Sequence, residues 1–108
     1  MKIIAQKLAD WQPCHRPRTV IITQGKNPII VAYTNERLPM ETYTVPVLND
    51  DEIVDTNGAG DAFVGGFIAY RLACKPMAEC IKAATFAAQE VIKQSGCVFP
   101  KENPMKLV

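Results

Sequence analysis

Residues 55–63, with the sequence D-T-N-G-A-G-D-A-F, place the strongest constraint on what this chain can fold into. They follow the apolar pair Ile53 and Val54, and they open a long apolar helical pattern. Two glycines therefore stand at the start of a helix, where the first backbone N–H groups have no partner within the helix. Because the helix dipole is positive at this end, the sequence predicts a helix entrance that can bind an anion.

Two better-known glycine loops do not fit this stretch. A dinucleotide fingerprint would need a third glycine at the position of Phe63. A P-loop beginning at Gly60 would need lysine at position 66 and Ser or Thr at position 67, but Gly66 and Phe67 stand there. For an isolated G-A-G, a packed helix start without a ligand is the more common interpretation. Four polar residues around the apolar helix start nevertheless favour a site: Asp55, Thr56, Asn57 and Asp61.

Hydrophobic periodicity predicts a helix, three strands and two further helices. The predicted elements are a helix over 3–11 ended by Pro13 and Pro17, strands over 19–23, 29–33 and 41–47, and helices over 59–74 and from 76 to a glycine stop at 95–96. The β-branched strand 19–23 is expected to be buried. This order is typical of a layered α/β domain, and 108 residues correspond to one domain.

The two long helices carry different packing signals. The first has small residues that let another element approach its backbone: Gly65, Gly66, Ala69 and Ala73. Each interior glycine costs about 1 kcal/mol relative to alanine, so a packing reason is expected. The second has apolar residues spaced by four and three positions, which predict one buried stripe: Met77, Ile81, Ala84, Ala88 and Val91.

Composition narrows the class of protein. The net charge of +1 gives no reason to expect nucleic acid or an anionic membrane as a partner. No apolar run approaches the ~20 residues of a membrane span, and we expect a cytoplasmic protein, with the nucleus as the alternative. The four cysteines show neither a C-x-x-C pair nor metal-ligand spacing with His15, so reduced, buried thiols and a loop histidine are expected: Cys14, Cys74, Cys80 and Cys97.

Three stretches together resemble the ribokinase (phosphofructokinase-B) family of sugar and nucleoside kinases and, within it, the adenosine kinases. They are D-T-N-G-A-G-D-A-F-V-G-G-F over 55–67, V-I-I-T-Q-G over 20–25, and S-G-C-V-F-P over 95–100. The resemblance runs from about Arg18 to Pro100. It implies a ribokinase-like layered α/β/α (Rossmann-like) domain, represented here by its C-terminal portion. It also implies ATP-dependent phosphorylation of the 5′-hydroxyl of adenosine to give AMP.

The resemblance assigns roles to particular residues. Asp61 matches the family's catalytic base, which takes the proton from the acceptor hydroxyl. The backbone N–H groups of Gly58, Ala59 and Gly60 form the expected anion hole for the γ-phosphoryl group. The remaining residues are expected to bind nucleotide: Thr23, Gln24, Gly25 and Asn57. The alternative for Asp61 is a carboxylate that the helix dipole favours by ~0.3–1 kcal/mol. The alternative for residues 23–25 is a plain strand-to-turn junction, and for Asn57 it is local capping. No metal ligand is assigned.

Other parts of the family pattern are expected to be missing. Mg²⁺ is expected from the family, but its N-x-x-E motif is taken to be absent, and the acidic stretch 49–52 is interpreted as a solvated turn. That stretch also replaces the purine-contacting glutamine of the adenosine kinases. We expect the C-terminal third of a kinase that is inactive alone and associates with the missing N-terminal portion or with itself. The alternatives are a non-catalytic nucleotide-binding module and another sugar kinase of this family.

Overall fold

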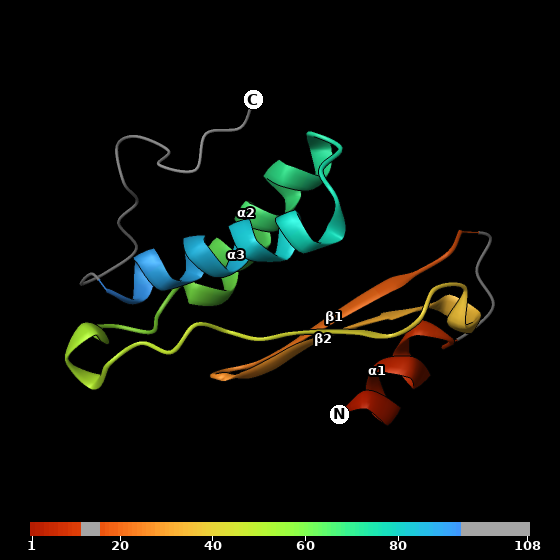
Figure 1. Ribbon diagram of the computed structural model, residues 1–108, viewed down its shortest axis with the longest axis horizontal. Coiled ribbons are helices and arrows are strands. Elements are labelled where there is room, and N and C mark those ends of the chain that lie inside the picture. Colours follow the sequence, from red (N-terminus) through yellow and green to blue (C-terminus); the bar gives the residue numbers. More distant parts are fainter. Residues whose placement is uncertain (12–15, 94–108) are drawn as a thin grey trace. The chain divides into compact units, whose positions relative to one another are not determined.

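The computed structural model describes residues 1–11 and 16–93. Its elements are α1 (Lys2–Ala9), β1 (Thr19–Gln24), β2 (Asn27–Tyr33), a 3₁₀ turn (Thr34–Glu36), β3 (Glu41–Tyr43), a second 3₁₀ turn (Asp50–Glu52), α2 (Ala59–Leu72) and α3 (Met77–Ile92) (Figure 1). The predicted order of one helix, three strands and two helices is confirmed. The glycine stop expected at 95–96 lies outside the described residues. The chain forms two compact units, Met1–Val47 and Leu48–Val108.

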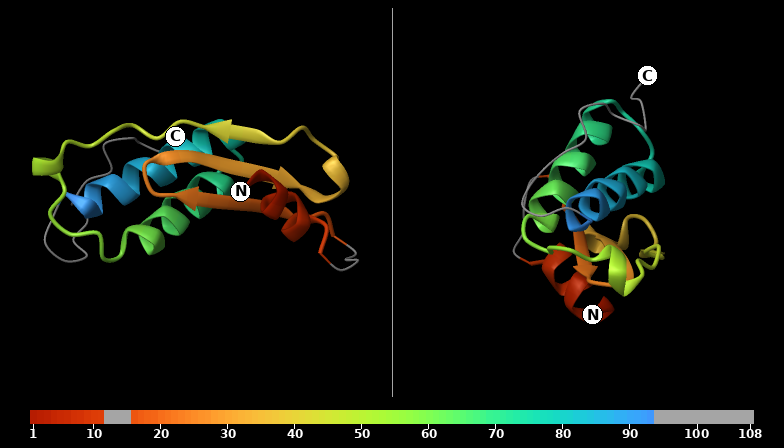
Figure 2. Two further views of the ribbon diagram at one scale, coloured as in Figure 1. Left: turned by 90° about the horizontal axis from the view of Figure 1, so that it is seen from below. Right: turned by 90° about the vertical axis from the view of Figure 1, so that its left-hand side faces the viewer.

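The first unit is a three-stranded antiparallel sheet with one helix against it. The strand order is β1-β2-β3. Between β1 and β2, Val20 pairs with Ala32 and Ile22 pairs with Ile30. The helix α1 lies along the β1–β2 hairpin in both views of Figure 2. It packs two alanines onto the sheet, and the cluster consists of Ala5, Ala9, Ile30 and Ala32. Because β2 is the central strand, all five residues from Ile29 to Tyr33 are buried.

Two expectations about the strands were wrong. No residue of β1 is fully buried, because β1 lies at an edge of the described sheet and β2 takes the centre. The third strand ends at Tyr43 instead of continuing to 47. Pro46 has no N–H group to donate to a neighbouring strand, and Val47 is 81% exposed.

The second unit contains α2 and α3, which pack along each other (Figures 1 and 2), and the 3₁₀ turn Asp50–Glu52 that precedes them. The predicted stripe of α3 is confirmed, since Ile81, Ala84 and Val91 are buried and Met77 and Ala88 are half-buried. A cluster of Tyr70, Cys80 and Ala83, with Phe67 packed against it, joins the two helices. None of the helices within 1–11 and 16–93 is long and apolar enough to cross a membrane.

The glycines of α2 differ in their surroundings. A Cβ atom on Gly66 would lie 2.9 Å from the carbonyl oxygen of Ala83 and 3.1 Å from the Cα atom of Ala84, so Gly66 has the packing reason that the sequence predicted. A Cβ atom on Gly65 would meet no atom within 4 Å. The predicted close approach therefore occurs at Gly66 and not at Gly65.

A left-handed residue ends α2. The N–H of Lys75 donates to the carbonyl of Tyr70 at 3.1 Å, and the N–H of Cys74 donates to that of Arg71 at 3.0 Å. This is a Schellman motif, whose left-handed position is usually glycine, but here Cys74 occupies it with φ of +58°. Cys74 is exposed and Cys80 is buried, so the expectation of buried thiols was wrong for Cys74. Cys14, His15 and Cys97 lie outside the described residues.

We expect Cys74→Gly to raise the free energy of unfolding by about 0.5–1 kcal/mol, because glycine adopts a positive φ without a Cβ penalty. Urea denaturation followed by circular dichroism measures this change. Cys74→Ala is the matched control: it removes the thiol but keeps the Cβ atom, and it should leave stability nearly unchanged. Equal stabilisation by both substitutions would contradict the backbone explanation.

Candidate active site

The C-terminal end of α3 holds the segment that leads into the glycine loop. The N–H groups of Val54 and Asp55 both donate to the carbonyl oxygen of Ile92, at 2.9 and 3.0 Å. This carbonyl is one of the last in α3, and such carbonyls have no partner within their own helix. The start of the loop is thereby fixed by a residue almost 40 positions later in the chain. The sequence did not predict the role of Ile92, because every residue type has a backbone carbonyl that can accept such hydrogen bonds.

The loop itself is built from short-range hydrogen bonds. Asp55 Oδ1 accepts the N–H of Asn57 at 2.9 Å, and the carbonyl of Thr56 accepts the N–H of Ala59 at 3.3 Å. The side chain of Asp55 therefore shapes the turn, as Asp side chains commonly do. Gly58 is the N-cap residue of α2 and has φ of +81°. This left-handed conformation favours glycine, since any Cβ atom would be strained there.

The first turn of α2 presents free backbone donors. The helix begins with the bond from the N–H of Ala62 to the carbonyl of Gly58 at 3.0 Å. Within the described part of the chain, no residue accepts the N–H of Gly60 or of Asp61. Gly60 is exposed, and a Cβ atom there would meet nothing within 4 Å. An anion can reach these two N–H groups at the positive end of the helix dipole.

Asp61 lies in the same first turn, and its side chain is exposed. The structure therefore brings Asn57, Gly58, Gly60 and Asp61 together within one turn. Ala59 belongs to the same turn, but its N–H already donates to Thr56. An exposed carboxylate beside free N–H donors can accept a proton from a hydroxyl group that lies next to a bound phosphate.

The other predicted nucleotide-binding residues, Thr23, Gln24 and Gly25, belong to the first unit. They form the end of β1 and the two-residue turn into β2, where Gln24 pairs with Asn27. Gly25 has φ of +61°, and the side-chain amide of Gln24 donates to the carbonyl of Pro28 at 2.7 Å. Gln24 and Gly25 therefore help to form the hairpin turn between β1 and β2. Thr23 is exposed. Nucleotide binding by these residues stays a prediction.

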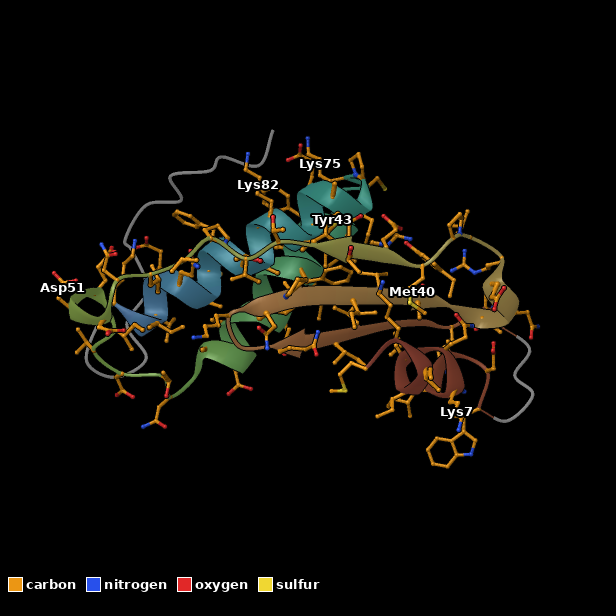
Figure 3. The ribbon with its side chains drawn as sticks, turned by 60° about the horizontal axis from the view of Figure 1, so that its bottom comes forward. Lys7, Met40, Tyr43, Asp51, Lys75 and Lys82 are labelled. Carbon is orange, nitrogen blue, oxygen red and sulfur yellow. The ribbon has the colours of Figure 1, made fainter. Side chains whose placement is uncertain are left out.

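The expected absence of an N-x-x-E motif was wrong as to the letters, because Asn49 and Glu52 have this spacing. In the structure the two residues close a 3₁₀ turn on each other. The N–H of Asn49 donates to Glu52 Oε1 at 3.1 Å, and the N–H of Glu52 donates to the carbonyl of Asn49 at 2.9 Å. The neighbouring Asp51 is exposed at the outside of the turn (Figure 3).

Because magnesium is expected from the family, metal-ligating side chains that gather closely would be its candidate ligands. Over 1–11 and 16–93, no three His, Cys, Asp or Glu side chains gather closely enough to hold a metal ion. Asn49 and Glu52 are hydrogen-bonded to each other within their own turn. At Gly60 and Asp61 the described residues offer N–H donors to an anion.

Comparison with known proteins defines the class to which this fold and turn belong. Residues 4–104 match the sequence profile of the pfkB family carbohydrate kinases. Because this match covers nearly the whole chain, the chain belongs to the pfkB family. The D-T-N-G-A-G-D stretch that carries the resemblance in the sequence is the turn that presents Gly60 and Asp61 in the structure.

Within the family, the chain is similar to adenosine kinases. Adenosine kinase 2 of Arabidopsis thaliana is 45% identical over 85 residues, which are 79% of this chain and 24% of that protein. Adenosine kinase of Dictyostelium discoideum is 34% identical over 106 residues, which are 96% of this chain and 30% of that protein.

The chain is also similar to solved structures of adenosine kinases. Adenosine kinase from Schistosoma mansoni in complex with 2-fluoroadenosine gives a TM-score of 0.83 at 40% identity, over 92% of this chain and 29% of that one. Adenosine kinase from Anopheles gambiae, in complex with P1,P4-di(adenosine-5) tetraphosphate, gives a TM-score of 0.79 at 40% identity. The match covers 89% of this chain and 28% of that one. The predicted ribokinase-like α/β fold is confirmed. The chain spans less than a third of the length of these relatives.

Proposed function

We propose that this chain is part of an adenosine kinase, which transfers the γ-phosphoryl group of ATP to the 5′-hydroxyl of adenosine. One observation carries this proposal: exposed Asp61 lies in the same helix turn as two N–H groups that have no acceptor among the described residues. The family supplies the reaction class. The relatives that are named for adenosine, and the Schistosoma mansoni structure with 2-fluoroadenosine, supply the acceptor.

In this proposal Asp61 removes the proton of the acceptor hydroxyl as the oxygen attacks the γ-phosphorus. The N–H groups of Gly60 and Asp61, with that of Gly58, stabilise the negative charge on the phosphoryl oxygens. Asn57, Thr23, Gln24 and Gly25 are the proposed nucleotide-contacting residues. Phosphoryl transfer also needs both substrates held in line. For that reason the chain by itself is expected to be inactive or nearly so.

ATP is the proposed co-substrate, and the reaction would serve purine salvage in the cytoplasm. Magnesium normally accompanies the nucleotide in such reactions. No three metal-ligating side chains gather within 1–11 and 16–93, and Mg²⁺ commonly takes only one or two carboxylates together with waters and the phosphates of the nucleotide. We propose that both units, residues 1–108, belong to one partial kinase domain, in agreement with the profile match over 4–104.

A chimera tests the function without requiring the chain to work alone. In Arabidopsis thaliana adenosine kinase 2, the 85 matched residues are replaced by their counterparts from this chain. We expect the chimera to convert adenosine to AMP with ATP, at a rate within about tenfold of the parent enzyme. Conversion is measured by chromatography of the nucleotides, and folding by circular dichroism.

Two outcomes of the chimera experiment would contradict the proposal. A folded chimera that forms no AMP would support the alternative of a nucleotide-binding module that has lost its chemistry. The N–H groups of Gly60 and Asp61, which have no acceptor among the described residues, would suit such a module as well. A chimera that phosphorylates ribose or fructose in preference to adenosine would instead identify a sugar kinase of the same family.

A further inference from the structure

One backbone oxygen holds the segment that precedes the glycine loop. The N–H groups of Val54 and Asp55 both donate to the carbonyl oxygen of Ile92, at 2.9 and 3.0 Å, and Figure 1 shows the end of α3 beside this segment. Ile92 is the last residue of α3, so its carbonyl lies at the negative end of the helix dipole. Two successive N–H groups aimed at one oxygen are a donor pair suited to a negative group. We call these two hydrogen bonds the Ile92 clamp.

The other end of the loop is fixed to the same helix by packing. At Gly66, α2 approaches α3 so closely that a Cβ atom would lie 2.9 Å from the carbonyl oxygen of Ala83. A cluster of buried side chains also joins the two helices. The clamp and this contact both lie in the unit Leu48–Val108. The glycine loop therefore runs between two points that are both attached to α3.

The residues between these two points are linked by a continuous set of short-range hydrogen bonds. After the clamp, Asp55 Oδ1 accepts the N–H of Asn57 at 2.9 Å, and the carbonyl of Thr56 accepts the N–H of Ala59 at 3.3 Å. Ala59 begins α2, and Asp61 follows in the same turn. A shift of the loop at the clamp would therefore be passed on to the first turn of α2, where the free N–H groups and the carboxylate lie.

We propose that Ile92 is a positioning residue for phosphoryl transfer. Through the clamp, its carbonyl sets where the N–H groups of Gly60 and Asp61 and the carboxylate of Asp61 lie. Ile92 acts through the loop and not by contact with a substrate. The inference rests on the proposed function for the reaction that it serves. A displacement of about 1 Å at a catalytic group can cost about 10²-fold in rate, so the effect of the clamp should be visible in kcat.

A purely structural explanation of the clamp makes a different prediction. The last carbonyls of a helix need partners from outside the helix, and Val54 and Asp55 supply two donors to one of them. If capping α3 were their whole effect, loss of a donor would lower the melting temperature and leave kcat of the folded enzyme unchanged. A positioning role lowers kcat in protein that is fully folded. The two explanations therefore differ in the kcat that they predict.

Val54→Pro removes one N–H group of the clamp, because proline has no N–H to donate. The preceding residue, Ile53, has an extended backbone with φ of −86° and ψ of 105°. Residues before a proline favour the extended region, so the backbone of Ile53 is compatible with this substitution. The matched control is Val54→Ala, which shortens the side chain but keeps the N–H group. The side chain of Val54 has no part in the clamp.

The background is a chimera in which the 106 matched residues of Dictyostelium discoideum adenosine kinase are replaced by their counterparts from this chain. The match covers 96% of this chain, so the chimera contains both Val54 and Ile92. We expect Val54→Pro to lower kcat for AMP formation about 10- to 100-fold, with the KM for adenosine changed less than twofold. The pH dependence of kcat should keep its position, because Asp61 remains the base. Val54→Ala should change kcat less than twofold.

Hydrogen exchange followed by mass spectrometry measures the clamp independently of activity. The amides of residues 55–62 should exchange at least about tenfold faster in Val54→Pro, and at an unchanged rate in Val54→Ala. If the proline prevents folding, the α-hydroxy analogue of valine at position 54 takes its place in both measurements. This analogue removes the same N–H group and keeps the side chain.

Three results would overturn the proposal. They are unchanged exchange over residues 55–62 in Val54→Pro, faster exchange with unchanged kcat in folded enzyme, and equal loss of kcat in Val54→Pro and Val54→Ala. An unsubstituted chimera that is folded but forms no AMP counts against the proposed function. In that case faster exchange in Val54→Pro still supports the hold of Ile92 on the turn, and unchanged exchange overturns it.

Discussion

Asp61→Asn in the chimeric kinase is expected to lower the rate of AMP formation by about 10²–10⁴-fold, the usual contribution of a general base. Asparagine keeps the size and the hydrogen-bonding shape of the side chain, but it cannot accept the proton. Asp61 is exposed in the first turn of α2, so the substitution removes no buried contact. The loss should therefore appear in kcat, with the melting temperature of the protein nearly unchanged.

The control for this experiment is Asp51→Asn. Asp51 is another exposed carboxylate of the same unit, on the turn shown in Figure 3, and it has no part in the proposed chemistry. Its substitution should change kcat less than twofold. The competing explanation of Asp61 is a carboxylate that only favours the helix N-terminus, worth about 0.3–1 kcal/mol. That explanation predicts a small loss of stability and an unchanged kcat, and such a result would remove Asp61 from the catalytic role.

The elements of this chain were predictable where a pattern repeats along the sequence. The stripe of α3 was found from its spacing, because each apolar residue faces the same side of the helix. The turn at Gly58 was found because it needs residue types that are rare inside a helix. Asp55 was named only among the polar residues that favour a site, and its bond to the N–H of Asn57 shows that its side chain shapes this turn.

Other features depend on contacts that residue types do not encode. The burial of β1 was overestimated, because a run of β-branched residues predicts a strand equally well at the edge and at the centre of a sheet. The exposure of Cys74 follows from where α2 ends, which is set by the Schellman bonds at Tyr70 and Arg71. The anchoring of the loop by Ile92 uses only backbone atoms. The N-x-x-E spacing of Asn49 and Glu52 is different, because it is visible in the sequence and was overlooked; the structure adds that the two residues are bonded within their own turn.

The two adjacent glycines of α2 are the clearest case of one residue type with two surroundings, and the same substitution separates them. Gly66→Ala is expected to lower the free energy of unfolding by about 1–2 kcal/mol. The new Cβ atom would lie 2.9 Å from the carbonyl oxygen of Ala83 and 3.1 Å from the Cβ of Ala87. Overpacking of this kind costs about 1–3 kcal/mol, and the better helix propensity of alanine offsets up to about 1 kcal/mol.

Gly65→Ala is the matched control, because it adds the same methyl group to the next residue of the same helix. Nothing lies within 4 Å of the added atom, so the propensity gain of about 1 kcal/mol should appear as higher stability. Urea denaturation of the 108-residue chain, followed by the helical circular dichroism signal, measures both changes on one scale. Opposite signs would place the α2–α3 contact at Gly66. If Gly66→Ala also stabilised the chain, the two helices could not pack as closely as Ala83 and Ala84 require.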